Sequence, residues 1–427
     1  MLERTDMKIS IISDLHLGFG QNTELENDCF AAFQEAIEKS LDCDLILLGG
    51  DVFDVRIPNT ETFTKAIEIL KKTLSTNPGA RIVQGLKKDI NEFPLIKEGI
   101  PVVGIAGNHE RRVKGLLNPV QGLERAGFLV YLHCNSVVLE KDGKKVAVHG
   151  MSSVPDQYGE QVLSEWNPKP IEGCFNILIM HLSIAPFLYA PCLIPLEKIP
   201  KGFDLYINGH VHGTVKTEYD GKPFIIPGSL LPTQITKDLS KHSFCKVSVE
   251  NSAILSVEFV SLDHQREIFY KEFLEPDSGV KEVEAYMDEI AKVKRPLKPI
   301  IKIVLSNRNI QTKEIEQLFR DSAIVRFNKK SIEEEAKQIQ PKDIAERVES
   351  VNELGKRLLR ESMHSEGLDS QAFETVFELL ESGKIEDAEN LIQSLANKKR
   401  SLRKLKAIRN RRIRANFIMS SNLSLFR

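Results

Sequence analysis

The sequence contains no apolar stretch that approaches the ~20 residues a membrane-spanning helix needs, so no membrane segment is expected. Its first residues, MLERTDMK, carry acids and lead directly into a strand pattern, which argues against a signal peptide. The six cysteines are scattered without a C-x-x-C pair, so free, reduced thiols are expected rather than a disulfide framework. These absences together predict a cytoplasmic protein.

The length of 427 residues exceeds what one ordinary hydrophobic core holds, so two or three domains are expected. In residues 1–262, apolar strand patterns alternate with amphipathic helix patterns such as residues 28–41 and 61–74, which indicates a layered α/β domain. Residues 263–331 predict a small β-α-β-α-β unit. Residues 332–427 keep only helical patterns and predict a partner-binding segment, because these helices are too few to enclose a core.

Five short apolar runs in the first half of the chain each lead into side chains that suit metal ions. The runs have the character of buried strands in an α/β sheet, and ligands in such sheets bind beyond the carboxyl ends of the strands. One such junction alone is more often a solvated strand end or a helix N-cap. Five in order predict a single site. The candidate ligands are Asp14, His16, Asp51, Asn108, His181, His210 and His212.

Seven ligands are enough for two ions if Asp51 bridges them. Two ions ~3.5–4 Å apart clamp a phosphate and stabilise the attacking and leaving oxygens of an in-line displacement, the chemistry of phosphodiester hydrolysis. The ligand set has nitrogen and oxygen but no thiolate, which favours Mn²⁺ and leaves Fe²⁺, Zn²⁺ and Mg²⁺ open. His149 also closes an apolar run, but we expect it to be structural and prefer His181 as the ligand.

His109 follows a candidate ligand and points the other way on an extended chain, toward a substrate. Its imidazole has an ordinary pKa close to working pH, so we predict that it is the catalytic acid. Glu110 is expected to orient the ring. Arg111 and Arg112 follow directly and are candidates for steering phosphates, although exposed basic loop residues often have no specific role.

The motifs resemble those of the calcineurin-like metallophosphoesterase superfamily, whose signature is D-x-H, G-D, G-N-H-D/E, H and G-H-x-H. All five blocks are present in order, as DLHLG, GGDVF, GNHE, MHLS and GHVH, across residues 14–212. The resemblance implies a four-layer αββα sandwich with a dinuclear centre. It also implies that Asp14, His16, Asp51 and His212 hold one ion, and that Asp51, Asn108, His181 and His210 hold the other.

Within the superfamily, the plan of the whole chain resembles the nuclease subunit of the DNA double-strand-break repair complex, the meiotic recombination eleven family with its bacterial counterpart SbcD. In that family a phosphoesterase domain precedes a small capping domain and a helical segment that binds a coiled-coil ABC-type ATPase, Rad-fifty. The resemblance implies a nucleoid-associated exonuclease and endonuclease, and a homodimer that pairs through residues 28–41 and 61–74. Some relatives have histidine where this chain has Asp54, so the balance of the two activities stays open, and Asp54 is a candidate for a contact that supports a metal ligand or reaches the substrate.

Residues 398–414 hold ten basic residues in seventeen on a helical apolar spacing. A charged run is usually a solvated face, but next to a phosphodiesterase it is also a natural contact for a DNA backbone or the ATPase. The side chains concerned include Lys398, Arg400, Arg403, Lys404, Arg409 and Arg411.

Two other functions remain open at this point. GNHE is shared with protein phosphatases, so a metallophosphatase or small-molecule phosphodiesterase is the enzyme alternative. A scaffold that only binds DNA or a partner is the second, although such a protein has no physical need for all seven ligands.

Overall fold

The computed structural model describes residues 7–76, 79–86, 99–113, 115–188, 192–235, 241–273, 280–306 and 312–329. The chain divides into two compact units, Met1–Lys330 and Ser331–Arg427, and every described residue belongs to the first. The predicted helical segment 332–427, its basic end 398–414 and the six basic side chains named there lie outside the described residues.

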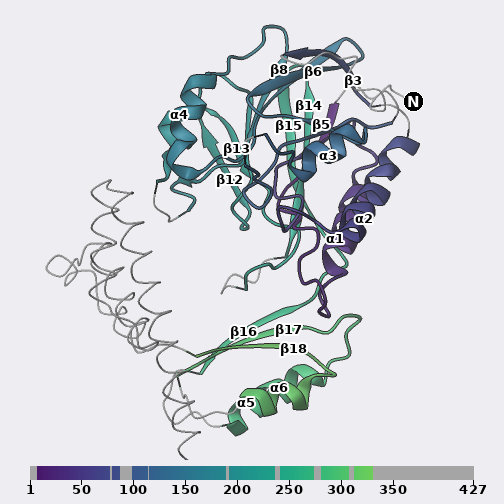
Figure 1. The fold of residues 1–427 in the computed structure, drawn as a ribbon, viewed down its shortest axis with the longest axis vertical. Helices are drawn as coiled ribbons and strands as arrows, with labels where there is room; N and C mark the ends of the chain where they lie inside the picture. Colours follow the sequence, from purple (N-terminus) through teal and green to yellow (C-terminus); the bar gives the residue numbers. More distant parts are fainter. Residues whose placement is uncertain are drawn as a thin grey trace, which may run out of the picture. The chain divides into compact units, whose positions relative to one another are not determined.

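A six-stranded sheet in the order β15-β14-β1-β2-β4-β5 forms one half of the sandwich. Its strands are β1 (Met7–Ile12), β2 (Leu45–Leu48), β4 (Val102–Gly104), β5 (Val130–Tyr131), β14 (Ser243–Glu250) and β15 (Ala253–Ser261). Strands β1, β2, β4 and β5 are parallel. Helices α1 (Asp28–Lys39), α2 (Thr60–Leu70) and α3 (Pro119–Arg125), with the 3₁₀ turn Lys71–Ser75, lie on one side of this sheet (Figure 1).

A seven-stranded sheet in the order β12-β13-β11-β8-β7-β6-β3 forms the other half. Its strands are β3 (Arg81–Leu86), β6 (Asn135–Lys141), β7 (Lys144–Met151), β8 (Phe175–Met180), β11 (Leu205–Asn208), β12 (Val215–Tyr219) and β13 (Lys222–Ile226). Helix α4 (Asp156–Trp166) packs on its outer face, and β9 (Ile184–Ala185), β10 (Ile194–Pro195) and the 3₁₀ turn Leu196–Lys198 lie in the β8–β11 connection. Strand β3 was not predicted, because its side chains are mostly exposed or half-buried and leave no apolar pattern.

The two sheets pack face to face, which explains why the strands that lead to the motifs are apolar on both sides. In β2, Leu45 and Leu47 belong to the core between the sheets, whereas Ile46 and Leu48 belong to the core under the helices. Alternate side chains of a strand point to opposite faces, so a strand buried on both faces shows a continuous apolar run. The predicted αββα sandwich is confirmed.

The five elements predicted after residue 262 are present in the predicted order. They are β16 (Ile268–Phe273), α5 (Val280–Ala291), β17 (Ile300–Leu305), α6 (Thr312–Phe319) and β18 (Ile324–Lys329). The three strands are parallel, and both helices share a core with one face of this sheet. The boundary between residues 262 and 263 as a domain limit stays a prediction. Among the described residues, no helix has the length and apolar character to cross a bilayer.

Candidate metal centre

The seven predicted ligands follow β1, β2, β4, β8 and β11, and the loops that carry them are bonded to one another. Asp14 N donates to Gly50 O at 3.0 Å, and His16 N donates to Asp51 O at 2.9 Å. Four of the seven, Asp14, His16, Asp51 and His210, have left-handed backbones with φ between 46° and 76°. Asp and His adopt this region more readily than most residues, but it still costs free energy, and such strain concentrates at functional sites.

Two glycines allow the loops to approach closely. A Cβ on Gly107 would lie 2.0 Å from Asp51 Oδ1, and one on Gly50, whose φ is +95°, would lie 2.5 Å from His181 Nδ1. No side chain fits at either distance. The glycines of the GGD and GNH motifs are therefore required because another motif's ligand occupies the space beside them.

Asp14, His16 and His212 form the first group of side chains. His16 Nε2 lies 3.2 Å from His212 Nε2, which lies 3.8 Å from Asp14 Oδ1. Asp51, His181 and His210 form the second group, with Asn108 between the imidazoles: Asn108 Oδ1 lies 3.1 Å from His181 Nε2 and 2.9 Å from His210 Nδ1. All predicted ligands are thus brought together.

The hydrogen bonds of the second group fix where its protons are. His181 Nδ1 lies 2.8 Å from Gly49 O, and a carbonyl only accepts, so Nδ1 carries the hydrogen. Ser183 Oγ donates to Asp156 Oδ1 at 3.0 Å and must therefore accept from His210 Nε2 at 3.1 Å. In the neutral rings, His181 Nε2 and His210 Nδ1 then both direct lone pairs at Asn108 Oδ1.

In the first group the hydrogen of one ring is placed by its partner. Asp54 Oδ1 lies 3.2 Å from His16 Nδ1 and accepts its hydrogen, so His16 Nε2 presents a lone pair to His212. The convergence of acceptors around Asn108 Oδ1 in the second group is unfavourable unless a positive charge lies between them. Two ligand atoms each ~2.1 Å from one ion at right angles lie about 3 Å apart, which is the spacing found here. The donor set therefore fits divalent cations.

The pKa values of the three imidazoles shift in different directions. Burial by itself would lower the pKa of His181, but the charge and hydrogen bond of Asp51 raise it to about 9. Burial and the charge of His181 lower the pKa of His210 to about 4, and burial and the charge of His16 lower that of His212 to about 4. The latter two rings are neutral near pH 7, the form in which imidazole binds a metal.

The two buried aspartates respond differently. Burial raises the pKa of Asp14 to about 6, partly offset by the charge of His181. Burial also acts to raise the pKa of Asp51, but His181, by charge and by hydrogen bond, holds it below its usual range. Asp51 is therefore the permanently ionised member of the cluster. It reaches His181 Nε2 with Oδ2 at 3.3 Å and accepts from His109 N with Oδ1 at 2.9 Å.

The His109 ring is half-exposed beside this cluster, and Asp54 orients it. His109 Nδ1 donates to Asp54 O at 2.7 Å, which leaves Nε2 as the nitrogen able to exchange a proton with a ligand. Asp54 thus contacts His16 with its carboxylate and His109 with its carbonyl. Sequence reasoning assigned the orienting contact to Glu110, and named Asp54 as a departure from relatives and as a candidate for a supporting or substrate contact.

Glu110 has a different position from the one expected. Its carboxylate is fully buried and accepts from Phe53 N and Gly107 N, both at 2.8 Å. Burial and the charge of Asp51 raise its pKa to about 8. The reason it does not orient His109 is that Phe53 N binds it to the loop after β2 and Gly107 N to its own loop after β4, so it joins the second motif to the third.

The two arginines after Glu110 differ from each other. Arg112 is half-buried, and its guanidinium donates to Arg56 O at 3.4 Å. Arg111 has a buried guanidinium nitrogen with no hydrogen-bond partner, and its charge is one of those that lower the pKa of His210. An unsatisfied buried donor is costly, so this nitrogen, which has no partner among the described residues, is suited to bind an anionic group of a ligand.

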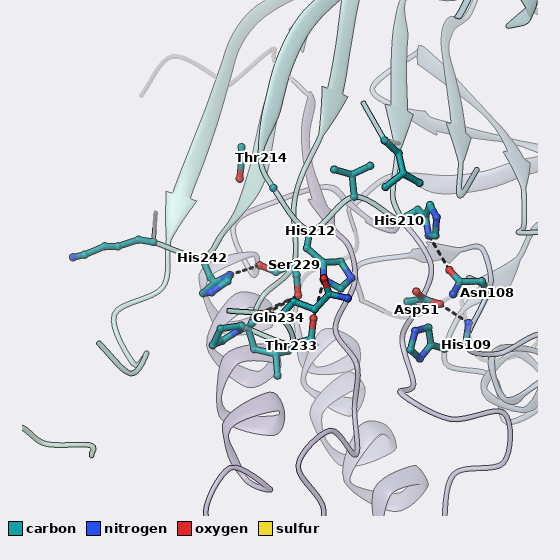
Figure 2. Close-up of a pocket in the computed structure, with 16 residues that line it drawn as sticks. Asp51, Asn108, His109, His210, His212, Thr214, Ser229, Thr233, Gln234 and His242 are labelled. Carbon is teal, nitrogen blue, oxygen red and sulfur yellow. Dashed lines mark hydrogen bonds between the residues drawn. The ribbon is translucent and has the colours of Figure 1, made fainter. Parts of the chain in front are cut away.

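A cavity of about 350 Å³ opens beside the cluster (Figure 2). It adds residues that the sequence did not indicate, because short polar loop residues carry no pattern. Thr233 Oγ1 lies 2.8 Å from His212 Nδ1, and Ser229 Oγ donates to Asp14 O at 2.9 Å. His149 lies elsewhere, between Ser136 Oγ (2.8 Å) and Asn176 Oδ1 (3.2 Å), as a buried structural histidine.

Comparison with known proteins agrees with this geometry. Residues 7–214 match the family model described as calcineurin-like phosphoesterase. This region is a calcineurin-like phosphoesterase domain. Because the matched residues contain all seven predicted ligands, the predicted superfamily and the predicted class of enzyme, a metal-dependent phosphoesterase, are confirmed.

Individual proteins similar to this chain include double-strand-break repair proteins. The DNA double-strand break repair protein Mre11 of Methanopyrus kandleri is 26% identical over 343 residues, covering 73% of this chain and 67% of the relative. The double-strand break repair protein MRE11 of Mus musculus is 28% identical over 271 residues, covering 55% of this chain and 38% of the relative. That of Arabidopsis thaliana is 26% identical over 278 residues, covering 55% and 38%. The match therefore spans two thirds of the archaeal relative but well under half of the other two.

Proposed function

We propose that this protein is a DNA nuclease of double-strand-break repair that hydrolyses phosphodiesters with two divalent metal ions. The observation that carries the proposal is the convergence of carboxylate and imidazole ligand atoms in both groups, with acceptor atoms facing one another around Asn108 Oδ1 in the second. The names of the relatives supply the substrate, DNA.

Asp14, His16, Asp51 and His212 would hold one ion. Asp51, Asn108, His181 and His210 would hold the other. Nitrogen and oxygen donors without thiolate favour Mn²⁺. When bound, two such ions neutralise the phosphate and support in-line displacement.

The chain's own side chains then have three tasks. Asp51, ionised, belongs to the second group and lies within 4.8 Å of a ring nitrogen of His16 in the first, so it would link the two. His109, held through Nδ1 by Asp54 O, is the acid that delivers a proton from Nε2 to the leaving alkoxide. Arg111 supplies its unpartnered guanidinium nitrogen to a phosphate of the substrate.

The partners are part of the same proposal. The segment 332–427 would bind a coiled-coil ABC-type ATPase, and its basic end would contact that ATPase or DNA. A homodimer has a candidate surface in five exposed apolar side chains on the loop before α2 and the loop before α3. These are Val55, Ile57, Val113, Leu116 and Leu117.

One experiment tests the core of the proposal. The purified full-length protein is analysed for bound metal and then incubated in Mn²⁺ or Mg²⁺ with a linear single-stranded oligonucleotide, p-nitrophenyl phosphate and a phosphopeptide. We expect about two metal ions per chain and fast cleavage of the oligonucleotide in Mn²⁺. Fast turnover of the phosphopeptide with untouched DNA would identify a phosphatase instead, and binding of DNA without turnover would identify a scaffold.

A further inference from the structure

The cavity beside the cluster has two chemically different ends (Figure 2). One end carries Asp51, Asn108, His109 and His210. The other carries Thr233, Gln234 and His242, and His212 lies between the two ends. Lys241, which precedes His242 in the chain, also lines the cavity. The proposed hydrolysis uses only the first end, so the second has no role in the reaction as described so far.

The second end is firmly attached to the loops of the first. Thr233 Oγ1 bonds His212 Nδ1 at 2.8 Å. His242 Nδ1 donates to Ser229 O at 3.0 Å, and Ser229 Oγ donates to Asp14 O at 2.9 Å. A ligand held at the second end is therefore held at a defined distance from the reacting phosphate, which is the condition for productive orientation.

The charge of the cavity suits a ligand that carries more than one phosphate. Among its 16 lining residues Asp51 is the single acid, and Lys241 adds a positive charge. Asp263, whose pKa is lowered chiefly by its hydrogen bond with Lys39 and also by Lys241, is already paired with Lys39 at 2.8 Å. Lys241 lines the cavity, and its charge also acts on the nearby carboxylate of Asp263.

The size of the cavity limits the ligand to a small unit. Its volume of about 350 Å³ is at the low end of the ~300–1,000 Å³ of small-molecule sites. Such a volume suits one nucleotide and excludes a base-paired duplex. A second cavity, of about 400 Å³, also includes Lys241 and His242 in its lining, so a strand is not confined to the first.

We propose that Thr233, Gln234, Lys241 and His242 form a subsite for the unpaired nucleotide next to the scissile phosphate. Lys241 binds the phosphate on the far side of that nucleotide, and Gln234, exposed and polar, faces its sugar and base. The subsite makes the enzyme select a nucleic-acid strand over an isolated phosphodiester. It rests on the proposed function, because a scissile phosphate must lie at the first end.

The test compares two substrates of the full-length protein in Mn²⁺. A single-stranded oligonucleotide has a neighbouring phosphate, and bis(p-nitrophenyl) phosphate has none. For Lys241→Gln we expect KM for the oligonucleotide to rise roughly tenfold with kcat unchanged, as for the loss of one charge-assisted hydrogen bond. The slope of log KM against log salt should fall by about 1. Hydrolysis of bis(p-nitrophenyl) phosphate should not change.

Two further variants complete the design. Lys241→Arg keeps the charge and should keep KM within a few-fold of the wild type, whereas Lys201→Gln removes an exposed lysine outside both cavities and should change neither substrate.

An unchanged KM and salt slope in Lys241→Gln overturn the subsite. Equal losses on both substrates also overturn it, because they indicate damage to the first end. If the wild-type protein cleaves neither substrate, the proposed function itself fails, which is a distinguishable result.

Discussion

Replacing His109 by asparagine separates proton transfer from metal binding. The asparagine amide can still donate to Asp54 O, as His109 Nδ1 does at 2.7 Å, but it has no group in the place of Nε2. The backbone bond from residue 109 to Asp51 Oδ1 (2.9 Å) does not depend on the side chain. The variant therefore removes the proposed acid and preserves the neighbouring geometry.

The expected effect is a fall in kcat of ~10²–10⁴-fold, the usual contribution of general acid catalysis, which corresponds to about 3–5.5 kcal/mol in the activation barrier. Metal content should equal that of the wild type, because the proposed ligands remain. Exposed His264 offers a matched control, and His264→Asn should change neither quantity.

The assay is oligonucleotide cleavage in Mn²⁺ on protein whose metal content has been measured. Cleavage at the normal rate would remove His109 from the role of acid. Loss of metal together with activity would instead make His109 a ligand, a possibility that its position within reach of His16 and Asp51 leaves physically reasonable.

Asp51→Asn should reduce bound metal from two ions to one or none and lower cleavage by more than ~10²-fold, because Asp51 contacts His181 in the second group and lies within 4.8 Å of His16 in the first. Two retained ions, measured by elemental analysis, would refute the bridging role. Arg111→Gln should raise KM for the oligonucleotide roughly tenfold with normal metal content. Arg125→Gln, a change at an exposed helix residue, is the control and should leave KM unchanged. If Arg111→Gln has the KM of the wild type, the unpaired nitrogen of Arg111 has no substrate partner. Burial lowers the pKa of His149 below its ordinary 6.5, so the unfolded chain takes up a proton that the folded protein resists, and stability should fall as pH drops below about 6.5. In His149→Gln the unfolding midpoint should fall less between pH 7 and 5 than in the wild type, and identical pH profiles would contradict this.

The sequence by itself determined the sandwich and the seven candidate ligands. Both are local properties: a strand buried on both faces is apolar throughout, as in Leu45–Leu48, and the ligand stands at its carboxyl end. The elements after residue 262 followed from periodicity in the same way. By contrast, the side chains of β3 are exposed or half-buried, so its sequence has no apolar pattern that would predict a strand.

Only the tertiary structure decided which atoms meet. The contact of Asp54 with His16 spans 38 positions, and that of Thr233 with His212 spans 21. Glu110 stands beside His109 in the chain, yet its carboxylate bonds Phe53 N, 57 positions away. Adjacency in sequence does not fix where a side chain finds its hydrogen bonds, because a buried polar group takes the partners that packing brings to it. The position of the protons on the imidazoles, and with it the case for cations, follows from those long-range contacts alone.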